Sequence, residues 1–241
     1  MMKRAIVVGA SSGIGLEVAR LLRSRGWTVA VAARRTERLA EFDIAERIDV
    51  TAADAGERLL RLVERLGGMD LYLHSAGIGH QNQMLAEDIE LATMETNAIG
   101  FTRMVGAAFR YMADNGGGHI AVISSVAGTK GLGPAPAYSA TKAMQNTYIQ
   151  ALEQLSNSRR LGIRFTDIRP GFVDTDLLKG DKQYPMLLEK TAVARDIVDS
   201  IDRHRHVRVI DWRWRIVVAV WRRIPRWLWR RLGLASLDTP Q

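Results

Sequence analysis

Residues 5–18 read AIVVGASSGIGLEV, and this short stretch decides the fold. Its β-branched start at 5–9 predicts a buried strand, and the apolar spacing over 15–26 predicts an amphipathic helix. Glycines in the turn between them let the backbone approach a pyrophosphate, and the N–H groups at the helix start then face that anion. The stretch predicts a dinucleotide-binding turn, and the alternative is a plain strand-to-helix connection. The residues expected at the dinucleotide are Gly9, Ser11, Ser12, Gly13, Ile14 and Gly15.

Short β-branched runs alternate with longer amphipathic segments along the rest of the chain. A second helix is expected over 52–68, ending at Gly67. Between Arg35 and Asp49 there is room for a helix of only about two turns. Strand–helix alternation with right-handed crossovers predicts an α/β fold with a doubly wound parallel sheet flanked by helices. The further strands are expected at 28–33, 46–50, 70–75, 119–124, 163–168 and 206–210.

The composition limits the chemistry. A length of 241 residues suits one α/β core. The chain has no Cys, which excludes disulfides, thiolate metal sites and cysteine catalysis, and favours the cytoplasm. Its first apolar run ends in a glycine turn and is not read as a signal peptide. His204 and His206 lie near no carboxylate cluster in the sequence, so we expect solvated histidines there and no metal site.

The end of the second predicted strand indicates which dinucleotide would bind. An acidic residue there would bond the ribose 2′-hydroxyl of NAD, but this chain has Arg34 and Arg35. A guanidinium fork suits a 2′-phosphate, so NADP is expected, with NAD kept open by the nearby Glu37. Asp49 and Val50 end the third predicted strand, where an adenine would lie. Asp49 is equally suited to cap the following helix.

The strongest local signal is YSATK, residues 138–142. Tyr138 and Lys142 are four residues apart and share one helix face. A neighbouring ammonium favours the phenolate and lowers the pKa of a tyrosine, which suits a general acid for a carbonyl or a base for an alcohol. Ser125, in SSVAG at the end of a predicted strand, can reach the same pocket, and Ser124 is the competing choice. Asn97 lies within a predicted helix, where an Asn often bends the helix or holds water.

The loop after the sixth predicted strand reads RPGFVDT, residues 169–175. Pro170 and Gly171 are expected to break that strand, and the loop can then cover the reacting end of the dinucleotide. The leucine-rich stretch 176–190 that follows favours an apolar substrate. The alternative is a segment that packs only on its own domain.

The motifs GASSGIG, SAG, NAIG, SSVAG, YSATK and PGFVDT, in this order, resemble the short-chain dehydrogenase/reductase superfamily in its single-domain form. The resemblance covers residues 3–210 and implies a seven-stranded Rossmann sheet, a nicotinamide cofactor, a small-molecule substrate and a homodimer or homotetramer. It implies that Tyr138 donates or accepts the proton, that Lys142 binds the nicotinamide ribose and tunes Tyr138, and that Ser125 orients the substrate carbonyl. Asn97 would hold a relay water. Pro170, Gly171, Val173 and Thr175 would lie at the cofactor, the last two at its carboxamide.

One motif departs from the pattern of the superfamily. Its members have an NNAG-like turn after the fourth strand, whereas this chain has His74 and Ser75 in place of the two asparagines. Ala76 and Gly77 remain, so close backbone approach is preserved. Ser75, Ala76 and Gly77 are therefore still expected at the cofactor.

The basic charge is concentrated at the C-terminus. Residues 1–202 hold 24 basic and 24 acidic residues, whereas 203–241 hold ten Arg, no Lys and two Asp, which accounts for the net charge of +8. Five of the six tryptophans lie there too, and Pro225 is expected to divide one helix into two. We therefore predict a dinucleotide-binding catalytic domain over 1–210 and a Trp/Arg-rich extension over 211–241.

Four interpretations of this extension compete. It packs on the body or on a neighbouring subunit. It attaches the protein to an anionic membrane surface through 212–231, on the cytoplasmic face. It docks an acidic carrier protein that bears an acyl substrate. Nucleic acid is not expected as a partner, because the neutral body offers no continuing basic groove. No apolar run approaches the about 20 residues that a membrane span needs.

These observations predict an NADP-dependent oxidoreductase that interconverts a carbonyl and a secondary alcohol by hydride transfer, on an apolar substrate. The alternative is a non-catalytic NADPH-binding regulatory or scaffold protein of the same fold that acts through the extension. The co-occurrence of Ser125, Tyr138 and Lys142 favours the enzyme.

Overall fold

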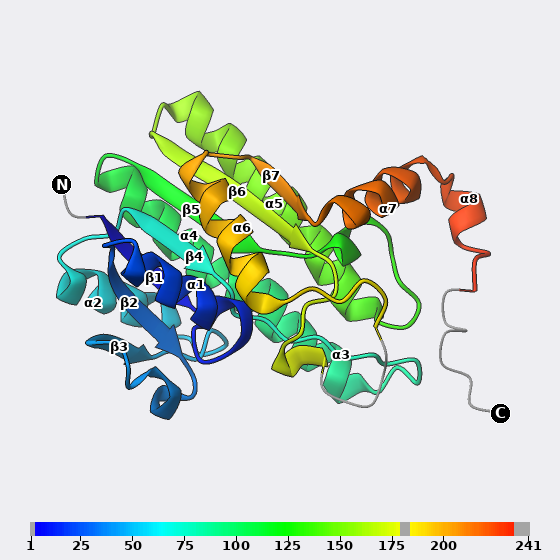
Figure 1. Ribbon diagram of the computed structural model, residues 1–241, viewed down its shortest axis with the longest axis horizontal. Coiled ribbons are helices and arrows are strands. Elements are labelled where there is room, and N and C mark those ends of the chain that lie inside the picture. The colour runs from blue at the N-terminus through cyan, green and yellow to red at the C-terminus, as the bar shows by residue number, and fades with distance from the viewer. Residues whose placement is uncertain (1–2, 179–183, 234–241) are drawn as a thin grey trace.

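The computed structural model describes residues 3–178 and 184–233. Seven strands form one parallel sheet, as predicted, and their order is β3-β2-β1-β4-β5-β6-β7 (Figure 1). Because β1 pairs with both β2 and β4, the strand order reverses at β1, and this is where α/β folds place their ligands. The strands are β1 Arg4–Val8, β2 Thr28–Ala33, β3 Ile44–Arg47, β4 Leu71–His74, β5 Gly118–Ile123, β6 Ile163–Pro170 and β7 Val207–Ile210.

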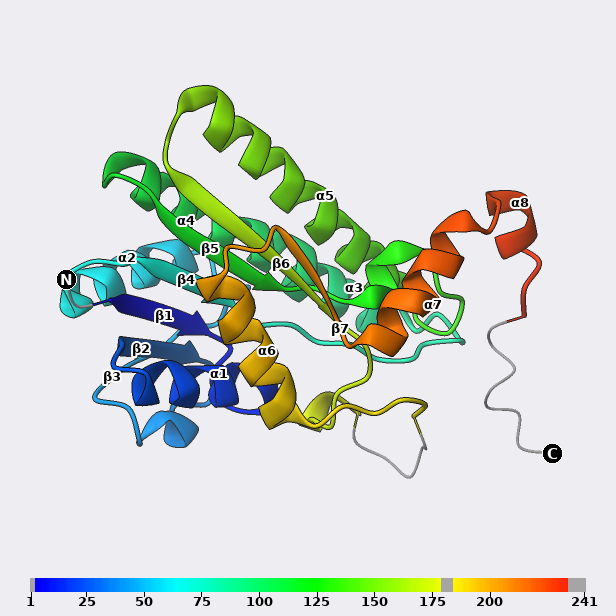
Figure 2. The same cartoon turned by 45° about the horizontal axis from the view of Figure 1, so that its top comes forward.

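Helices cover both faces of the sheet, with α1 and α6 on one face and α2, α4 and α5 on the other (Figures 1 and 2). The helices are α1 Gly13–Ser24, α2 Ala55–Leu66, α3 Glu87–Met94, α4 Phe101–Asp114, α5 Pro136–Arg159, α6 Lys190–Asp202, α7 Trp212–Arg223 and α8 Arg226–Trp229. Single turns are η1 Thr36–Leu39, η3 Val126–Thr129 and η4 Asp176–Leu178, and η2 Glu95–Gly100 is a π-helical turn.

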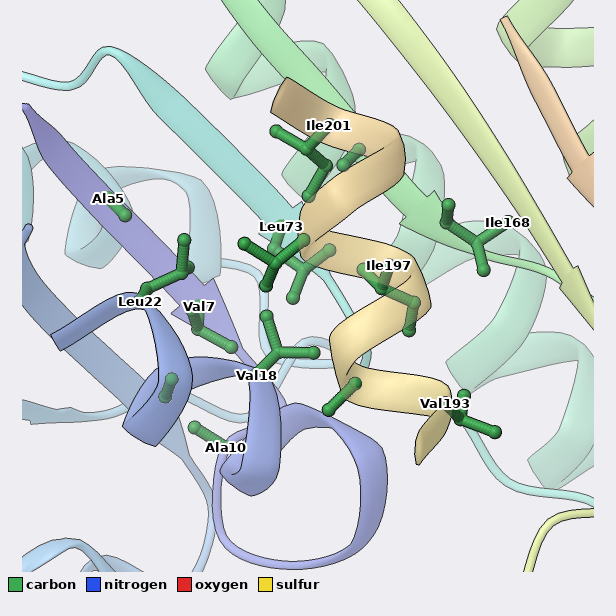
Figure 3. Close-up of a cluster of buried hydrophobic side chains, with 14 of the residues drawn as sticks. Ala5, Val7, Ala10, Val18, Leu22, Leu73, Ile168, Val193, Ile197 and Ile201 are labelled. Atoms are coloured by element: carbon green, nitrogen blue, oxygen red, sulfur yellow. The ribbon is translucent and has the colours of Figure 1, made fainter. Parts of the chain in front are cut away.

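The sheet divides the interior into two apolar cores. Along β1, Ala5 and Val7 point into the core beneath α1 and α6, and Ile6 and Val8 point into the opposite core. Figure 3 shows side chains of α1, such as Val18, meeting those of α6 over the sheet. A strand that is buried on both faces needs apolar residues throughout, which explains the continuous β-branched runs in the sequence.

Three local features differ from the sequence-based expectations. β3 ends at Arg47, because its partner β2 ends at Ala33, with which Arg47 is in register. The segment before β3 forms the 3₁₀ turn η1 and not a two-turn helix. Pro170 does not break β6: it is the last residue of the strand and is in register with Ile210. The ladder continues past this proline because the Gly171 N–H donates to the Ile210 carbonyl (3.0 Å).

Two histidines are buried on central strands, His74 as the last residue of β4 and His119 near the start of β5. The Nδ1 atom of His74 lies 2.8 Å from the Tyr72 hydroxyl, and the Nε2 atom of His119 lies 2.8 Å from the Thr166 hydroxyl. Burial lowers the pKa of His74 to about 3, helped by the positive charge of Lys142. Burial also lowers the pKa of His119 to about 4, helped by His204 and Arg164. Both imidazoles are therefore neutral in the folded protein at neutral pH.

We expect these histidines to make the fold acid-labile. Because both folded-state pKa values lie below the ordinary value of about 6.5, the unfolded chain binds more protons below that pH. The free energy of unfolding should therefore fall as the pH drops from about 6.5 toward 3. His74→Asn and His119→Asn should each flatten this dependence in urea titrations at several pH values. The exposed His80→Asn is the control, and an equal flattening by it would contradict the prediction.

Candidate active site

The predicted glycine turn lies at the C-terminal end of β1, against the loop that follows β4. Gly9 has a φ of +90°, and a Cβ there would lie 2.6 Å from the Ser75 carbonyl carbon. A Cβ on Gly15 would lie 2.9 Å from the Ser75 hydroxyl oxygen. The Ser75 N–H also donates to the Val8 carbonyl (2.8 Å). Only glycine fits at these two positions, so the glycine turn packs directly against the segment 75–77.

The start of α1 is open to an anion. Its first turn contains no acidic residue, and the Ser12 side chain makes no capping hydrogen bond. The first N–H groups of the helix are therefore available to a pyrophosphate. Thr175 closes this groove from the side of β6, since a Cβ on Gly13 would lie 3.2 Å from its methyl carbon. The residues present fit a dinucleotide.

The two arginines after β2 lie beside this turn, and both are exposed. A guanidinium nitrogen of Arg35 lies 3.3 Å from the Ser12 hydroxyl and 3.4 Å from the Ser11 hydroxyl. Burial raises the pKa of Asp49, but hydrogen bonds from Thr51 and then the positive charges of Arg34 and Arg47 bring this pKa below its ordinary value. Two positive charges therefore flank the groove at the place where an adenosine ribose would lie.

Asp49 and Val50 lie in the loop between β3 and α2. Asp49 accepts from the Thr51 backbone N–H (3.0 Å) and hydroxyl (2.8 Å), so it stabilises this loop. It does not cap α2, which starts at Ala55. The Val50 carbonyl accepts from Arg103 of α4 (2.9 Å), and this contact joins the loop to α4.

Tyr138 and Lys142 lie on one face of α5, with the Lys142 Nζ atom 5.7 Å from the centre of the Tyr138 ring. The Lys142 ammonium is buried and donates to the Ile123 carbonyl (3.2 Å) and the Gln145 side-chain oxygen (3.1 Å). Burial lowers the pKa of Lys142 to about 8, and the negative charge of Asp167 opposes this shift. Burial raises the pKa of Tyr138, and a hydrogen bond with Ser125 opposes the rise.

The two serines after β5 point in different directions. The Ser125 oxygen accepts from the Ala127 N–H (3.1 Å), which leaves its proton free to donate toward Tyr138 and a substrate. The Ser124 hydroxyl instead bonds Asp167 and the Ile168 carbonyl, inside the sheet. Of the two candidates, Ser125 therefore lies at Tyr138.

Asn97 lies in the π-helical turn η2 and is fully buried. Its side-chain oxygen accepts from the Ile78 N–H (2.9 Å), and its side-chain nitrogen donates to the Ile78 carbonyl (2.7 Å). The amide therefore clamps the loop after β4, which carries Ala76 and Gly77. A Cβ on Gly77 would lie 3.2 Å from the Asn97 oxygen and 3.7 Å from the Lys142 Nζ atom. Asn97 thus ties this loop to the reacting end of the groove.

The loop after β6 lies beside the glycine turn, where a Cβ on Gly13 would meet Thr175. Pro170 and Gly171 lead into Phe172, and Val173 forms a bridge with Leu188. The Asp174 N–H donates to the Leu188 carbonyl (2.9 Å), so the two sides of the loop are joined. Of the stretch 176–190 that we associated with the substrate, residues 179–183 lie outside the described residues.

Sequence reasoning missed two side chains that hold the reacting residues. Gln145 is buried three residues after Lys142. This helical spacing places the two side chains on one face of α5, and it could have indicated their contact. Glu90 of α3 accepts from the Ala137 N–H (3.0 Å) and from Asn82 (2.9 Å). It therefore caps the start of α5 directly before Tyr138, and no local sequence pattern indicates a partner 47 residues away.

Comparisons with known proteins agree with this geometry. The crystal structure of actinorhodin polyketide ketoreductase with NADPH is 26% identical, with a TM-score of 0.75 over 87% of this chain and 95% of that one. A short chain dehydrogenase from Burkholderia cenocepacia in complex with NADP has a TM-score of 0.82 over 96% of this chain and 98% of that one. At 20% identity this second likeness shows the fold alone.

Curated sequences lead to the same family. A Myxococcus xanthus protein described as an uncharacterized oxidoreductase is 35% identical over 197 residues, which are 76% of this chain and 77% of that protein. One from Mycobacterium tuberculosis, also described so, is 28% identical over 226 residues, 87% of this chain and 88% of that protein. Residues 3–184 match the short chain dehydrogenase family. The chain belongs to the short-chain dehydrogenase family and is an NAD(P)-dependent oxidoreductase.

Proposed function

We propose that this protein is an NADP-dependent oxidoreductase that interconverts a carbonyl and a secondary alcohol, with an apolar substrate. The observation that carries the proposal is the meeting of Ser125, Tyr138 and Lys142 beside the dinucleotide groove. Ser125 forms a hydrogen bond with Tyr138, and the Lys142 ammonium lies near the Tyr138 ring, so both can assist proton transfer by Tyr138. A regulatory protein that only binds NADPH would have no need of this arrangement.

The proton chemistry follows from the geometry. The nicotinamide, when bound, supplies or accepts the hydride. In the direction of reduction Tyr138 gives its phenolic proton to the substrate oxygen, and in oxidation it takes the proton back. The Lys142 ammonium stabilises the phenolate left behind. Ser125 donates its hydroxyl proton to the same substrate oxygen, because its own oxygen is already held by the Ala127 N–H.

Three observations support NADP. Arg34 and Arg35 place two positive charges where a 2′-phosphate would lie, and Arg35 already reaches the serines of the glycine turn. The ketoreductase described above, which is 26% identical, was crystallised with NADPH. No acidic side chain directly follows β2, where an NAD enzyme would bind the ribose hydroxyls.

Exposed apolar side chains on the loops that follow β4 and β6 support an apolar substrate. The loop after β4 carries the exposed Met84 and Leu85, and the loop after β6 carries the exposed Leu177 and Leu187. The loop after β4 borders Tyr138, since a Cβ on Gly79 would lie 2.8 Å from its ring. The homo-oligomeric state and the cytoplasmic location expected from the sequence stay predictions.

We expect Tyr138→Phe to lower kcat/KM for carbonyl reduction by at least about a hundredfold, because the phenolic proton is lost while the ring still packs. NADPH oxidation with a panel of apolar ketones measures this. Tyr111→Phe, which removes a hydroxyl from α4, is the control. If no ketone is reduced by the unchanged protein, or if Tyr138→Phe keeps full activity, the proposal is wrong.

We expect Arg34→Asp to change cofactor preference. Loss of a charged hydrogen bond to the 2′-phosphate should lower kcat/KM for NADPH by about ten- to a hundredfold, and the new carboxylate should favour NADH. The ratio of the two kcat/KM values reports the change. Arg61→Asp alters the charge equally on the exposed face of α2 and should leave the ratio unchanged. An unaltered ratio in Arg34→Asp removes the 2′-phosphate role.

We expect kcat/KM for carbonyl reduction to decline above about pH 8, where Lys142 loses its proton. Because the negative charge of Asp167 raises the pKa of Lys142, Asp167→Asn should move this decline to lower pH. Asp196→Asn removes a carboxylate that pairs with Arg208 elsewhere, and it should not move the profile. A profile that shifts equally in both variants would contradict the assignment to Lys142.

A further inference from the structure

The C-terminal extension has a composition unlike the rest of the chain. Residues 212–233 contain seven Arg and five Trp but no Lys, Asp or Glu. Two helices, α7 and α8, form most of this segment, with Pro225 between them. They stand out from the body at the end of the sheet where β6 and β7 finish (Figures 1 and 2).

One side of the extension is fixed to the body. Trp214 and Val218 of α7 are buried in the core beneath α1 and α6. The Trp229 indole N–H donates to the Gly131 carbonyl (2.7 Å), and Lys130 donates to the Ile224 carbonyl (3.0 Å). The extension therefore has a fixed orientation, and its other side is presented to the surroundings.

That other side is apolar along α7. Trp212, Ile216 and Val220 are four residues apart and are 60%, 56% and 52% exposed. Beyond Pro225, Trp227 is 61% exposed. One side of α7 is apolar and buried against the body, and the opposite side is apolar and exposed. Exposed apolar rows of this kind mark interaction sites.

Arginines surround this apolar row. Among the described residues, Arg215, Arg222, Arg226 and Arg230 take part in no ion pair, whereas Arg213 is neutralised by Asp211. Exposed Trp at the level of lipid head groups, with guanidinium groups beside it, suits an anionic bilayer surface. We propose that α7 and α8 bind the surface of an anionic lipid bilayer.

The proposed contact is with the bilayer surface, and other occupants fit α7 and α8 less well. None of the described helices is long and apolar enough to cross a membrane. A second copy of the chain is a poorer occupant, because its own basic extension would meet this one with like charge. Nucleic acid is poorer because the body carries no net charge and the exposed row is apolar.

The test uses the full chain and vesicles of phosphatidylcholine, with and without phosphatidylglycerol. We expect co-sedimentation only with phosphatidylglycerol, release by salt, and a blue shift of the tryptophan emission. Replacing Arg215, Arg222, Arg226 and Arg230 by Gln should weaken partitioning about fivefold for each arginine, and so by more than about a hundredfold in all. Trp212→Ser with Trp227→Ser should also weaken it.

The control removes the same charge elsewhere, by changing the exposed Arg61, Arg110, Arg159 and Arg195 to Gln. This variant should partition within about twofold of the unchanged protein. The proposal is overturned if it weakens binding as much as the extension variant, or if the unchanged protein ignores phosphatidylglycerol. It is also overturned if the tryptophan variant dissociates a dimer, or loses DNA binding, while vesicle binding stays unchanged.

A second inference rests on Gln145 and deepens the proposed function. This side chain is 0% exposed and joins two residues of the site. Its nitrogen donates to the Asn97 backbone carbonyl (2.8 Å), and its oxygen accepts from the Lys142 ammonium (3.1 Å). We infer that Gln145 is a positioning residue, which holds the Lys142 ammonium at a fixed distance from Tyr138.

Direct titration of Lys142 tests this inference without turnover. The chain has six lysines, so NMR of protein with labelled lysine side chains can resolve Lys142. Gln145→Met keeps the volume but removes the acceptor, and it should lower the pKa of Lys142. Gln145→Glu adds a negative charge at the same place and should raise it. Opposite shifts are expected, with the exposed Gln150→Met unchanged.

The positioning role is overturned if Gln145→Met and Gln145→Glu shift the pKa of Lys142 equally, or if neither shifts it. This holds whatever the activity of the protein. Activity is measured separately: an inactive unchanged protein would contradict the proposed function and leave the titration result standing. In an active protein, Gln145→Met should lower kcat for reduction more than it raises the KM for NADPH. If the role of Gln145 were purely structural, Gln145→Met would lower stability without affecting kcat more than the KM for NADPH.

Discussion

The site depends on one constraint, which is that the Lys142 ammonium must stay charged while buried. Taking such a charge out of water is costly unless several partners compensate. Here a carbonyl at the end of β5, the Gln145 oxygen and the field of Asp167 on β6 supply that compensation. Each comes from a different element, so the position of the ammonium depends on the sheet and on α5 together.

The surrounding elements are arranged to keep this position. Glu90 accepts a hydrogen bond from the first turn of α5, and this contact fixes the position of Tyr138 in the site. The π-helical turn η2 directs the Asn97 carbonyl to Gln145 and its side chain to the loop after β4. That loop in turn lies against the glycine turn, where Ser75 and Gly15 are in contact. The dinucleotide groove and the proton-transfer residues are thus built as one packed unit.

The sequence was informative wherever the chemistry is local. The glycine turn, the four-residue spacing of Tyr138 and Lys142, and the buried parallel strands all follow from patterns within a few residues. Contacts between distant segments were not predictable: Glu90 meets α5 across 47 residues, and β3 ends where its partner ends. Pro170 remains in β6 because the N–H of the next residue, Gly171, donates to the Ile210 carbonyl and completes the ladder.

The contact between Gly171 and Trp214 constrains how this protein can change over evolution. The indole of Trp214 packs so closely on Gly171 that a Cβ at this glycine would collide with the ring. The same ring is 5.4 Å from that of Phe172, so the loop after β6 is shaped around the extension. A lineage that lost the extension would expose this loop, and one that replaced the glycine would displace α7. The two positions should therefore vary together among descendants of this gene.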